Sequence, residues 1–313
     1  MSRNVLVAGE TLVDFIPDRA GPLTDVESFT RRAGGAPANV AVGLSRLDET
    51  PWFCTALATD PFGEYLSSVL AGEGLPDRFV TTHDECTTAL AFVSHDADAD
   101  RGFTFYRDET ADVQLDTASI PDETLADVEY VVVGGVSLTV EPSRTATFDL
   151  VDRARTHDCT VVFDPNDRPE LWDDAVDPSA TLERMLERVD VVKATADDVA
   201  SLDVEDDDIA ESLLAFGPHT VFLTHGSAGS TAESTAAAPW GAGEWSHPGF
   251  DVEPVDTTGA GDAFTAGVVA ALVDGRPPVE VLRFANAVAA ETTTSPGAMT
   301  ALPNRDALED VLR

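Results

Sequence analysis

The sequence predicts an α/β fold in which a doubly wound, mostly parallel sheet is flanked by helices. Short apolar runs recur without polar alternation, as is typical of strands covered on both faces, and segments with helical periodicity separate them. The predicted strands are Val5–Ala8, Trp52–Leu57, Tyr130–Val133, Thr160–Phe163, Val189–Val192 and Thr220–Leu223. The predicted helices are Ala36–Leu47, Ser143–Arg155, Ser179–Arg188, Asp207–Phe216, Ala260–Val273 and Val279–Thr292.

One segment does not fit this alternation. Residues 87–94 and 103–107 are strand-like and flank the acidic run 95–102, a pattern that predicts a β-hairpin with a polar turn. Residues 14–32 are also extended. In the simplest interpretation the hairpin only shields an edge of the main sheet. The chain has no internal repeat and no low-complexity linker, which favours a single domain over residues 1–313.

The charge balance is a further strong signal. The chain carries 57 Asp and Glu residues against 19 Lys and Arg residues, a formal net charge of −38, and Lys193 is the only lysine. The acidic residues are spread through periodic segments, which indicates a folded, carboxylate-covered surface rather than a disordered tail. Such a surface indicates adaptation to high salt, where a Debye length of about 3 Å at 1 M screens self-repulsion. An ordinary acidic cytosolic enzyme is the alternative, but it would retain more lysine.

The composition also disfavours several partners. Nucleic acid is disfavoured because no basic patch could displace its counterions. We expect no membrane partner and a cytoplasmic location, because no apolar run reaches transmembrane length and the N-terminal run is too short for a signal peptide. Cys54, Cys86 and Cys159 are odd in number and lack metal-ligand spacing, which predicts reduced thiols.

The run Asp-Thr-Thr-Gly-Ala-Gly-Asp at 256–262 directly precedes a helix of small residues. A Gly-Ala-Gly turn at a helix N-terminus leaves N–H groups without partners at the positive end of the helix dipole, which makes an anion site. Asp262 would repel a resting phosphate there, but it could accept a hydroxyl proton during phosphoryl transfer. The helix N-terminus should keep this carboxylate ionised. The run predicts a kinase that acts on an alcohol; alternatively, Asp262 only caps the helix.

Polar or glycine-rich residues follow most of the predicted strands. In open α/β sheets ligands bind at the carboxyl ends of the strands, so these residues should converge on one crevice. They are Gly9-Glu10 (leading to Asp14), Gly134-Gly135, Asp164-Pro165-Asn166, Lys193 and Thr224-His225-Gly226.

Together with a second segment, Gly-Gly-Ala-Pro-Ala-Asn-Val-Ala at 34–41, the 256–262 run resembles the two motifs of the ribokinase-like (PfkB) carbohydrate kinases. The resemblance runs from about Val5 to Pro303. It implies a ribokinase-like fold with a small β-sheet lid, formed by about residues 12–33 and 86–108, that covers the sugar and serves as a surface for a homodimer or higher oligomer.

The resemblance also implies roles for individual residues. Asp262 would be the catalytic base, and Gly259, Ala260 and Gly261 would supply N–H groups to the phosphoryl group. The sugar would be bound by Asp14, Gly34, Gly35 and Asn39. The 34–41 segment is also interpretable as the turn that starts a helix, and both interpretations can hold.

The remaining implied residues belong to the nucleotide and ion sites. The 164–172 block resembles a segment of fructokinases and 2-keto-3-deoxygluconate kinases, so Asn166 would contact phosphates or Mg²⁺ and Arg168 the sugar or a phosphate; a surface loop is the alternative. Lys193 and Asp198 would lie near the phosphates, although the family usually has Glu where Asp198 stands. Lys193 could instead be a strand-end residue whose charged group snorkels to solvent. The nucleotide loop and adenine pocket would comprise Thr224, Gly226, Gly229 and Asn286, and Asp256 would belong to a monovalent-cation site that binds K⁺.

The acceptor is expected to be fructose. The strand Phe103–Arg107 is more similar to fructokinases, and it would place Tyr106 and Arg107 at the substrate. Arg107 and Arg168 could equally clamp the carboxylate of 2-keto-3-deoxygluconate. ATP with Mg²⁺ would be the donor. A dinucleotide-dependent oxidoreductase is disfavoured because no Gly-x-Gly-x-x-Gly turn follows the first strand, and an inactive sugar-binding regulator is disfavoured because Asp262 is present.

Overall fold

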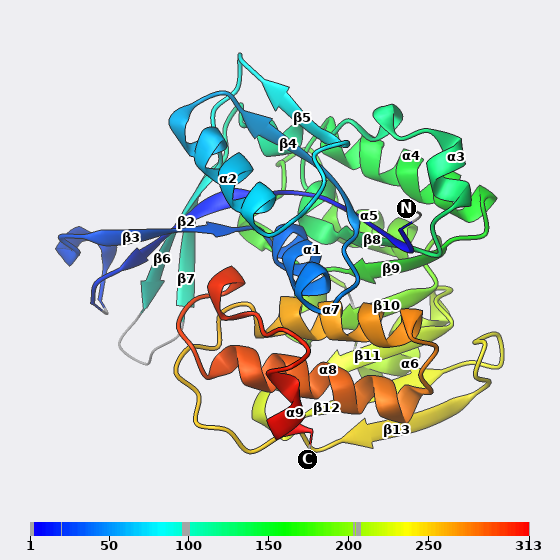
Figure 1. Cartoon of the computed structure of the whole chain (residues 1–313). Helices are drawn as coiled ribbons and strands as arrows, with labels where there is room; N and C mark the ends of the chain where they lie inside the picture. Colours follow the sequence, from blue (N-terminus) through cyan, green and yellow to red (C-terminus); the bar gives the residue numbers. More distant parts are fainter. Residues whose placement is uncertain (1–2, 20, 96–100, 203, 205–207, 313) are drawn as a thin grey trace.

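The computed structural model describes residues 3–19, 21–95, 101–202, 204 and 208–312. Its centre is a nine-stranded sheet in the order β13-β12-β11-β10-β9-β8-β1-β4-β5 (Figure 1). Neighbouring strands from β11 to β5 run parallel, whereas β12 and β13 add an antiparallel edge. The strands are β1 (Val5–Ala8), β4 (Trp52–Ala58), β5 (Val80–His83), β8 (Tyr130–Gly134), β9 (Thr160–Asp164), β10 (Val191–Ala194), β11 (Thr220–Thr224), β12 (Ser230–Ser234) and β13 (Gly243–His247).

Helices cover both faces of this sheet, so the predicted doubly wound α/β class is confirmed (Figure 1). Alternate residues of β1 show the two layers: Val5 and Val7 join the core beneath α1, α7 and α8, whereas Leu6 and Ala8 join the core beneath α3 to α6. The helices are α1 (Ala36–Arg46), α2 (Pro61–Gly72), α3 (Asp122–Ala126), α4 (Ser143–Thr156), α5 (Pro178–Leu186), α6 (Ile209–Ala215), α7 (Ala260–Val273), α8 (Pro278–Thr293) and α9 (Leu308–Val311).

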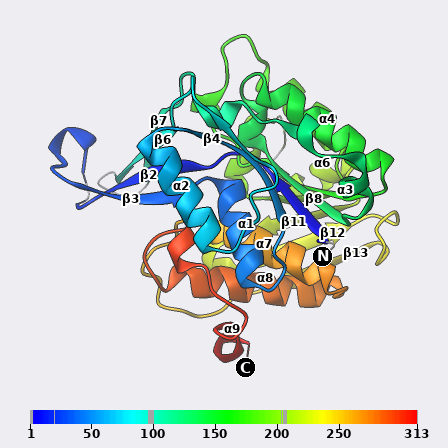
Figure 2. The same cartoon turned by 45° about the horizontal axis from the view of Figure 1, so that its top comes forward.

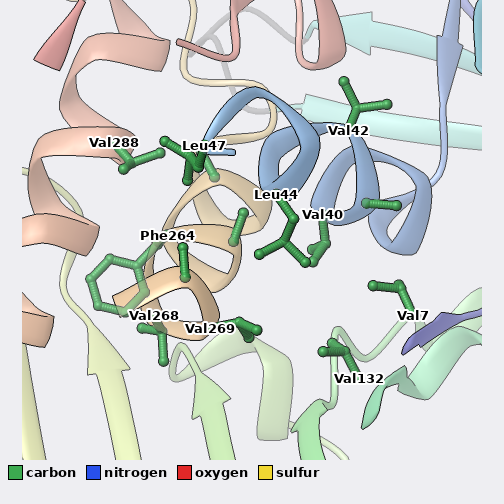
Figure 3. Close-up of a cluster of buried hydrophobic side chains, with 14 of the residues drawn as sticks. Val7, Val40, Val42, Leu44, Leu47, Val132, Phe264, Val268, Val269 and Val288 are labelled. Carbon is green, nitrogen blue, oxygen red and sulfur yellow. The ribbon is translucent and has the colours of Figure 1, made fainter. Parts of the chain in front are cut away.

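The first core holds the two motif-bearing helices together. Figure 3 shows Val40 and Leu44 of α1 near Phe264 and Val268 of α7, all of them buried. Small residues bring the helices close: a Cβ at Gly43 of α1 would lie 2.8 Å from the Ala266 side chain of α7. Because α1 and α7 start at the same end of the sheet, their N-termini meet at the site described below.

A separate four-stranded sheet, in the order β3-β2-β6-β7, projects beside the main sheet (Figures 1 and 2). Its strands β2 and β6 are parallel and its other pairs antiparallel. They fall in the two segments predicted for the lid, except that one strand extends to Gly34; residues 96–100 of the predicted turn lie outside the described residues. The strands are β2 (Leu12–Pro17), β3 (Phe29–Gly34), β6 (Leu90–His95) and β7 (Arg101–Tyr106).

The structure differs from the sequence prediction at a few elements. Strand β10 starts at Val191 rather than Val189, because the backbone of Val189 still bonds to Leu186 at the end of α5. Helix α6 starts at Ile209, and Asp207, its predicted first residue, lies outside the described residues. The elements α2, β5, β12 and β13 were not predicted; β12 and β13 lie at the sheet edge and alternate in burial, so they lack a continuous apolar run. No helix in the described part of the chain is both long and apolar enough to cross a membrane.

Candidate active site

A cavity of about 230 Å³ lies where the lid meets the carboxyl ends of the main-sheet strands, and we call it the acceptor cavity. It brings together residues far apart in the sequence, from the lid, from α1 and α7 and from the ends of β1, β8, β9 and β10. Its lining is Glu10, Leu12, Asp14, Gly35, Ala36, Asn39, Phe103, Phe105, Arg107, Val136, Asn166, Arg168, Leu171, Lys193, Thr195, Asp198, Thr258, Gly259, Gly261, Asp262 and Ala298.

Asp262 lies in the first turn of α7, which starts after Gly259 in a left-handed conformation and has no side-chain cap. The first N–H groups of a helix have no intrahelical partner, so this turn offers donors beside the carboxylate. The Asn39 amide donates a hydrogen bond of 2.7 Å to Asp262 Oδ2, and both side chains are buried. The two sequence motifs, 223 residues apart, therefore meet in one contact.

The protonation of Asp262 differs from the sequence expectation. Burial raises its pKa to about 7, and the hydrogen bond from Asn39 and the charges of Lys193 and Arg168 offset only part of that effect. The sequence predicted that the helix N-terminus keeps this carboxylate ionised; burial opposes that ionisation, so the carboxyl group titrates near neutrality rather than well below it. A carboxylate with a pKa near neutrality is a stronger base than an exposed one, which suits proton removal.

Gly34 and Gly35 are required by close approaches at the start of α1. A Cβ at Gly34 would lie 2.0 Å from Asp14 Oδ2, and one at Gly35, whose φ is +102°, would lie 2.6 Å from the carbonyl of Glu10. The turn starts α1, as one of the two interpretations predicted, and it lies against Asp14 at the edge of the cavity; the binding of a sugar by Gly34 and Gly35 stays a prediction. Burial, with a contribution from Asp262, raises the pKa of Asp14 to about 7.

Lys193 is buried at the end of β10 between two carboxylates. Its Nζ lies 3.1 Å from Asp164 Oδ2 and 3.5 Å from Asp198 Oδ2. Burial opposes its charge, but Asp164, Asp198 and Asp262 together raise its pKa, so it is a fixed cation. A Cβ at Gly261 would lie 3.2 Å from this Nζ, which places the ammonium group against the predicted anion turn. The alternative that Lys193 is a strand-end residue whose ammonium group snorkels to solvent is wrong, because the side chain is buried.

Hydrogen bonds to a buried carboxylate hold the segment from Asp164 to Trp172 in place. Asp167 is buried, and its carboxylate accepts hydrogen bonds from the Trp172 indole at 2.8 Å and from the Ser201 backbone at 3.2 Å. Asn166, in a left-handed conformation with φ of 40°, and Arg168 both line the acceptor cavity. The surface-loop alternative is therefore wrong for these two residues.

The two lid residues predicted to bind substrate have different positions. Arg107 lines the acceptor cavity, and its Nε lies 2.5 Å from Asp112 Oδ2. The Tyr106 side chain is 61% exposed and packs against Phe92 on the opposite face of the lid. The prediction for Tyr106 is wrong for the single chain, because strand residues alternate between faces. The cavity is instead lined by its neighbours Phe103 and Phe105, whose rings stack at 5.8 Å.

A second cavity, of about 400 Å³, lies on the other side of the 256–261 turn, and we call it the nucleotide cavity. Thr257 and Ala260 line it, whereas Thr258, Gly259 and Gly261 line the acceptor cavity. The turn therefore stands between the two cavities. The remaining lining is Gly226, Ser227, Pro248, Gly249, Phe250, Asp251, Val252, Pro254, Asn286, Ala289, Ala290 and Thr293.

Two of the four residues predicted for the nucleotide loop and adenine pocket line this second cavity, and two do not. Gly226 and Asn286 line it, and Asn286 is held by hydrogen bonds from its amide to Ser230 Oγ (2.6 Å) and the Leu282 carbonyl (2.7 Å). Thr224 ends β11 and is not part of the lining. Gly229 is not part of it either: its φ is +88° and a Cβ would lie 2.0 Å from the His247 carbonyl, so it shapes the loop.

Asp256 braces the start of the catalytic turn. Its carboxylate accepts hydrogen bonds from the Thr258 backbone (2.9 Å) and hydroxyl (2.6 Å), and from the Gly297 backbone (2.8 Å). It thus ties the 256–262 run to the 297–298 turn, the two segments from which a cation site was expected.

Comparison with known proteins places this arrangement in a family. Residues 2–305 match the model of the pfkB family of carbohydrate kinases. The chain belongs to the PfkB family. It is 34% identical to a fructokinase of Klebsiella pneumoniae, with 99% of both chains covered, and 33% identical to a probable fructokinase-4 of Arabidopsis thaliana, with 97% of this chain and 95% of the relative covered.

Solved structures agree with the sequence relatives. A fructokinase from Xylella fastidiosa with bound ATP has a TM-score of 0.86 at 29% identity and covers 100% of this chain and 98% of its own. A fructokinase variant from Vibrio cholerae O395 with fructose, ADP and potassium bound has a TM-score of 0.85 at 29% identity, covering 100% and 99%. The expected ribokinase-like fold and carbohydrate-kinase class are therefore confirmed.

Asp164 and Glu10 were predicted only as strand-end residues of the crevice, without a role, and both are buried at this PfkB site. Asp164 accepts hydrogen bonds from Lys193 and from Thr265 Oγ1 (3.0 Å), and burial raises its pKa although Lys193 opposes the shift. Glu10 lines the acceptor cavity and is 2% exposed. Asp164 ends β9 and Glu10 lies two residues past β1, which is the position from which the sequence predicted them to converge on the crevice.

Proposed function

We propose that this chain is an ATP-dependent fructokinase that transfers the γ-phosphoryl group of ATP to a hydroxyl of fructose. The observation that carries the proposal is the contact between Asn39 and Asp262, which unites the acceptor motif and the catalytic motif inside one cavity. Fructose is favoured over other sugars because relatives named as fructokinases match nearly the whole chain. Phosphoryl transfer needs mainly positioning and charge stabilisation, and the site is organised for both.

The proposed reaction begins at Asp262. A fructose hydroxyl placed against this carboxylate transfers its proton to it as the hydroxyl oxygen bonds to the γ-phosphorus and the bond to ADP breaks. Asn39 holds the carboxylate through Oδ2, leaving Oδ1 for the hydroxyl. The N–H groups of Gly259 and Gly261 and the Lys193 ammonium group stabilise the negative charge that develops on the phosphoryl oxygens. The Ala260 N–H was also predicted for this role, but it donates to the Thr257 carbonyl at 3.3 Å and is not included.

Mg²⁺ would enter with the nucleotide and neutralise phosphate charge. Asn166 and Asp198 both line the acceptor cavity near Lys193 and supply the oxygen atoms that this ion prefers. Asp198 fits the role: burial alone would raise its pKa, but Lys193 and the hydrogen bonds from Thr195 lower it, so the group stays ionised. The shorter acid found here in place of the family's Glu thus retains its charge.

The remaining elements of the proposal concern ions, assembly and location. Asp256 and the 297–298 turn would form a K⁺ site. The presence of potassium in the Vibrio cholerae fructokinase complex supports this part of the proposal. The lid face that carries the exposed Tyr106 and the partly buried Phe15 and Phe92 would pair with a second copy to form a homodimer. The cysteines are free within the described residues, which suits the proposed cytoplasmic location.

The proposal is tested by ADP release from Mg-ATP in molar KCl, with D-fructose and 2-keto-3-deoxygluconate as parallel acceptors. Turnover with fructose is expected. Turnover of the keto acid alone would instead identify a sugar-acid kinase. Absence of turnover with either sugar, together with normal ATP binding, would favour a sugar-binding regulator. Replacing KCl with NaCl or a bulky-cation salt at equal ionic strength tests the K⁺ site, because only specific binding makes activity depend on the cation.

A further inference from the structure

Asp60 lies between the main sheet and the lid, outside both cavities, and the reaction above does not use it. It follows the end of β4 by two residues and is the N-cap of α2. Its Oδ1 accepts hydrogen bonds from the backbone N–H groups of Phe62 (3.0 Å) and Gly63 (2.8 Å). These are N–H groups that a helix leaves without intrahelical partners. One part of the side chain therefore has an ordinary capping role.

The same carboxylate also binds Thr88. Its Oδ1 accepts a hydrogen bond of 2.6 Å from the Thr88 hydroxyl, and its Oδ2 accepts one of 2.8 Å from the Thr88 backbone. Thr88 lies two residues before Leu90, where β6 of the lid begins, and it is 7% exposed. Capping does not require these two bonds, because Oδ1 already accepts from the first turn of α2. Asp60 thus connects α2 to the segment that leads into the lid.

The α2 end of this connection is held firmly. A Cβ at Gly63 would lie 1.9 Å from the carbonyl oxygen of Ala58, the last residue of β4, so α2 begins directly against the main sheet. Burial would raise the pKa of Asp60, but the hydrogen bonds from Thr88, Gly63 and Phe62 lower it, so the group stays ionised. Hydrogen bonds to an ionised acceptor are stronger than those between neutral groups. The bonds to Thr88 therefore form a strong link to a fixed element.

The lid end of the connection leads to the acceptor cavity. Ala91, three residues after Thr88, is paired with Asp14 of β2 and with Phe105 of β7. Asp14 and Phe105 both line the acceptor cavity. Because strand pairing fixes these residues relative to β6, the position of Thr88 determines where they lie above the main sheet.

The lid has a small core of its own. Leu12, Ala89 and Ala91 are its buried members, and Phe103 and Phe105 pack against them. A core of this size removes little apolar surface from water, so it contributes little to holding the lid in one place. Polar connections at the base of the lid should therefore have a larger share in fixing its position.

We propose that Asp60 is a positioning residue for phosphoryl transfer, which anchors the lid so that Asp14 and Phe105 stay at the acceptor cavity. The inference rests on the proposed function, in which this cavity binds the sugar. A lid without the anchor would hold the sugar less tightly and admit water in its place. The water oxygen would then bond to the γ-phosphorus as the bond to ADP breaks, its proton would pass to Asp262, and inorganic phosphate would form. No lid residue in the described part of the chain lines the nucleotide cavity, so ATP binding should not need the anchor.

The test is Asp60→Ser. Serine is itself a favoured N-cap residue, so α2 keeps a cap, but its single oxygen cannot also accept from the Thr88 backbone. We measure the KM for D-fructose, the KM for ATP, and inorganic phosphate released per fructose phosphorylated. The fructose KM should rise about fivefold or more and the hydrolysed fraction about threefold or more, with the ATP KM within about twofold of the wild type. Unchanged values in a folded variant, or an equal rise in both KM values, would overturn the inference.

The matched control is Asp177→Ser. Asp177 is the N-cap of α5, its carboxylate accepts a hydrogen bond of 3.2 Å from the Ala180 backbone, and it lines neither cavity. The substitution therefore makes the same change of charge and cap without touching the lid. Both KM values and the hydrolysed fraction should match the wild type. A change equal to that of Asp60→Ser would mean that losing any capping carboxylate is sufficient, which contradicts the proposal.

Thr88→Val and Thr88→Ser provide a second comparison in case Asp60→Ser does not fold. Valine keeps the shape of threonine but removes the hydroxyl that donates to Asp60, whereas serine keeps that hydroxyl. The fructose KM should rise about threefold with valine and stay within about twofold of the wild type with serine; an equal rise in both, or no rise with valine, would overturn the inference. Failure of the proposed function is distinguishable, because the wild type would then show no fructose turnover.

Discussion

The acceptor cavity and the nucleotide cavity lie on opposite sides of one turn, but their lining residues differ in chemical character. Charged side chains crowd the acceptor cavity, among them Glu10, Asp14, Arg107, Lys193 and Asp262. The nucleotide cavity is lined by glycine, proline, alanine and other small or apolar residues, with Asp251 as its only charged lining residue in the described part of the chain. On the proposed function, we expect the acceptor cavity to recognise its ligand by charge and hydrogen bonding, and the nucleotide cavity to do so mainly by shape.

This difference determines how each cavity should respond to change. Removing a charged side chain from the acceptor cavity should change the reaction rate or the choice of acceptor, because the buried groups around it shift one another's pKa and share hydrogen bonds. Adding bulk on the nucleotide side alters affinity, because an apolar lining has few polar contacts to lose. The predictions below test this division, starting with the largest expected effect.

Asp262→Asn should lower kcat for fructose by about a thousandfold or more, because the amide cannot accept the hydroxyl proton. The affinity for ATP should stay within a few-fold of the wild type, since Asp262 does not line the nucleotide cavity. Steady-state kinetics and calorimetric titration of ATP give the two values. If the variant retained more than a tenth of the wild-type kcat, Asp262 would not be the base.

Ala289→Phe should raise the KM for ATP at least tenfold and leave the KM for fructose unchanged. Ala289 lies on α8 and lines the nucleotide cavity, so the added ring fills space that the nucleotide needs. Val279→Phe is the control, because Val279 is on the same helix but is 52% exposed. A rise in the fructose KM of the first variant would show that the cavities are not independent.

The acceptor side alone should respond to pH near neutrality. The pKa of Asp262 is raised to about 7, so the group is increasingly protonated below that pH and cannot accept a proton. We therefore expect kcat/KM for fructose to rise about tenfold per pH unit below 7 and to level off above it, with Glu10 and Asp14 contributing to the same profile. ATP binding without sugar should change little over this range. A flat activity profile would contradict the raised pKa.

Salt should act mainly on the nucleotide side, with the smallest effect of the four. The net charge of −38 repels ATP but exerts no force on neutral fructose. Raising KCl from about 0.2 to about 2 M shortens the range over which the protein's charge acts. The KM for ATP should therefore fall about threefold, and the KM for fructose should stay unchanged. The melting temperature should rise over the same interval, as expected for a protein adapted to salt. Equal changes in both KM values would indicate an effect on folding instead.

The roles of residues in the 256–262 run were easier to predict from the sequence than the side-chain positions in the lid. Gly259 and Asp262 could be interpreted locally, because a glycine turn followed by a small-residue helix predicts unpartnered N–H groups at a helix N-terminus. Tyr106 could not be assigned to a face, since alternation alone does not say which side of a strand meets the site. Glu10 was recognised as a polar strand-end residue, but nothing in the sequence revealed that its carboxylate would accept a hydrogen bond from the first residue of α1.

By itself, the sequence determined the α/β class, the family resemblance and the location of the catalytic run, because apolar periodicity, glycine turns and strand-end polarity are local patterns. Only the tertiary structure decided the protonation of Asp262, the partners of Arg107 and the division into two cavities. These properties depend on which groups are removed from water together, and burial is a consequence of packing between residues as distant as Asn39 and Asp262.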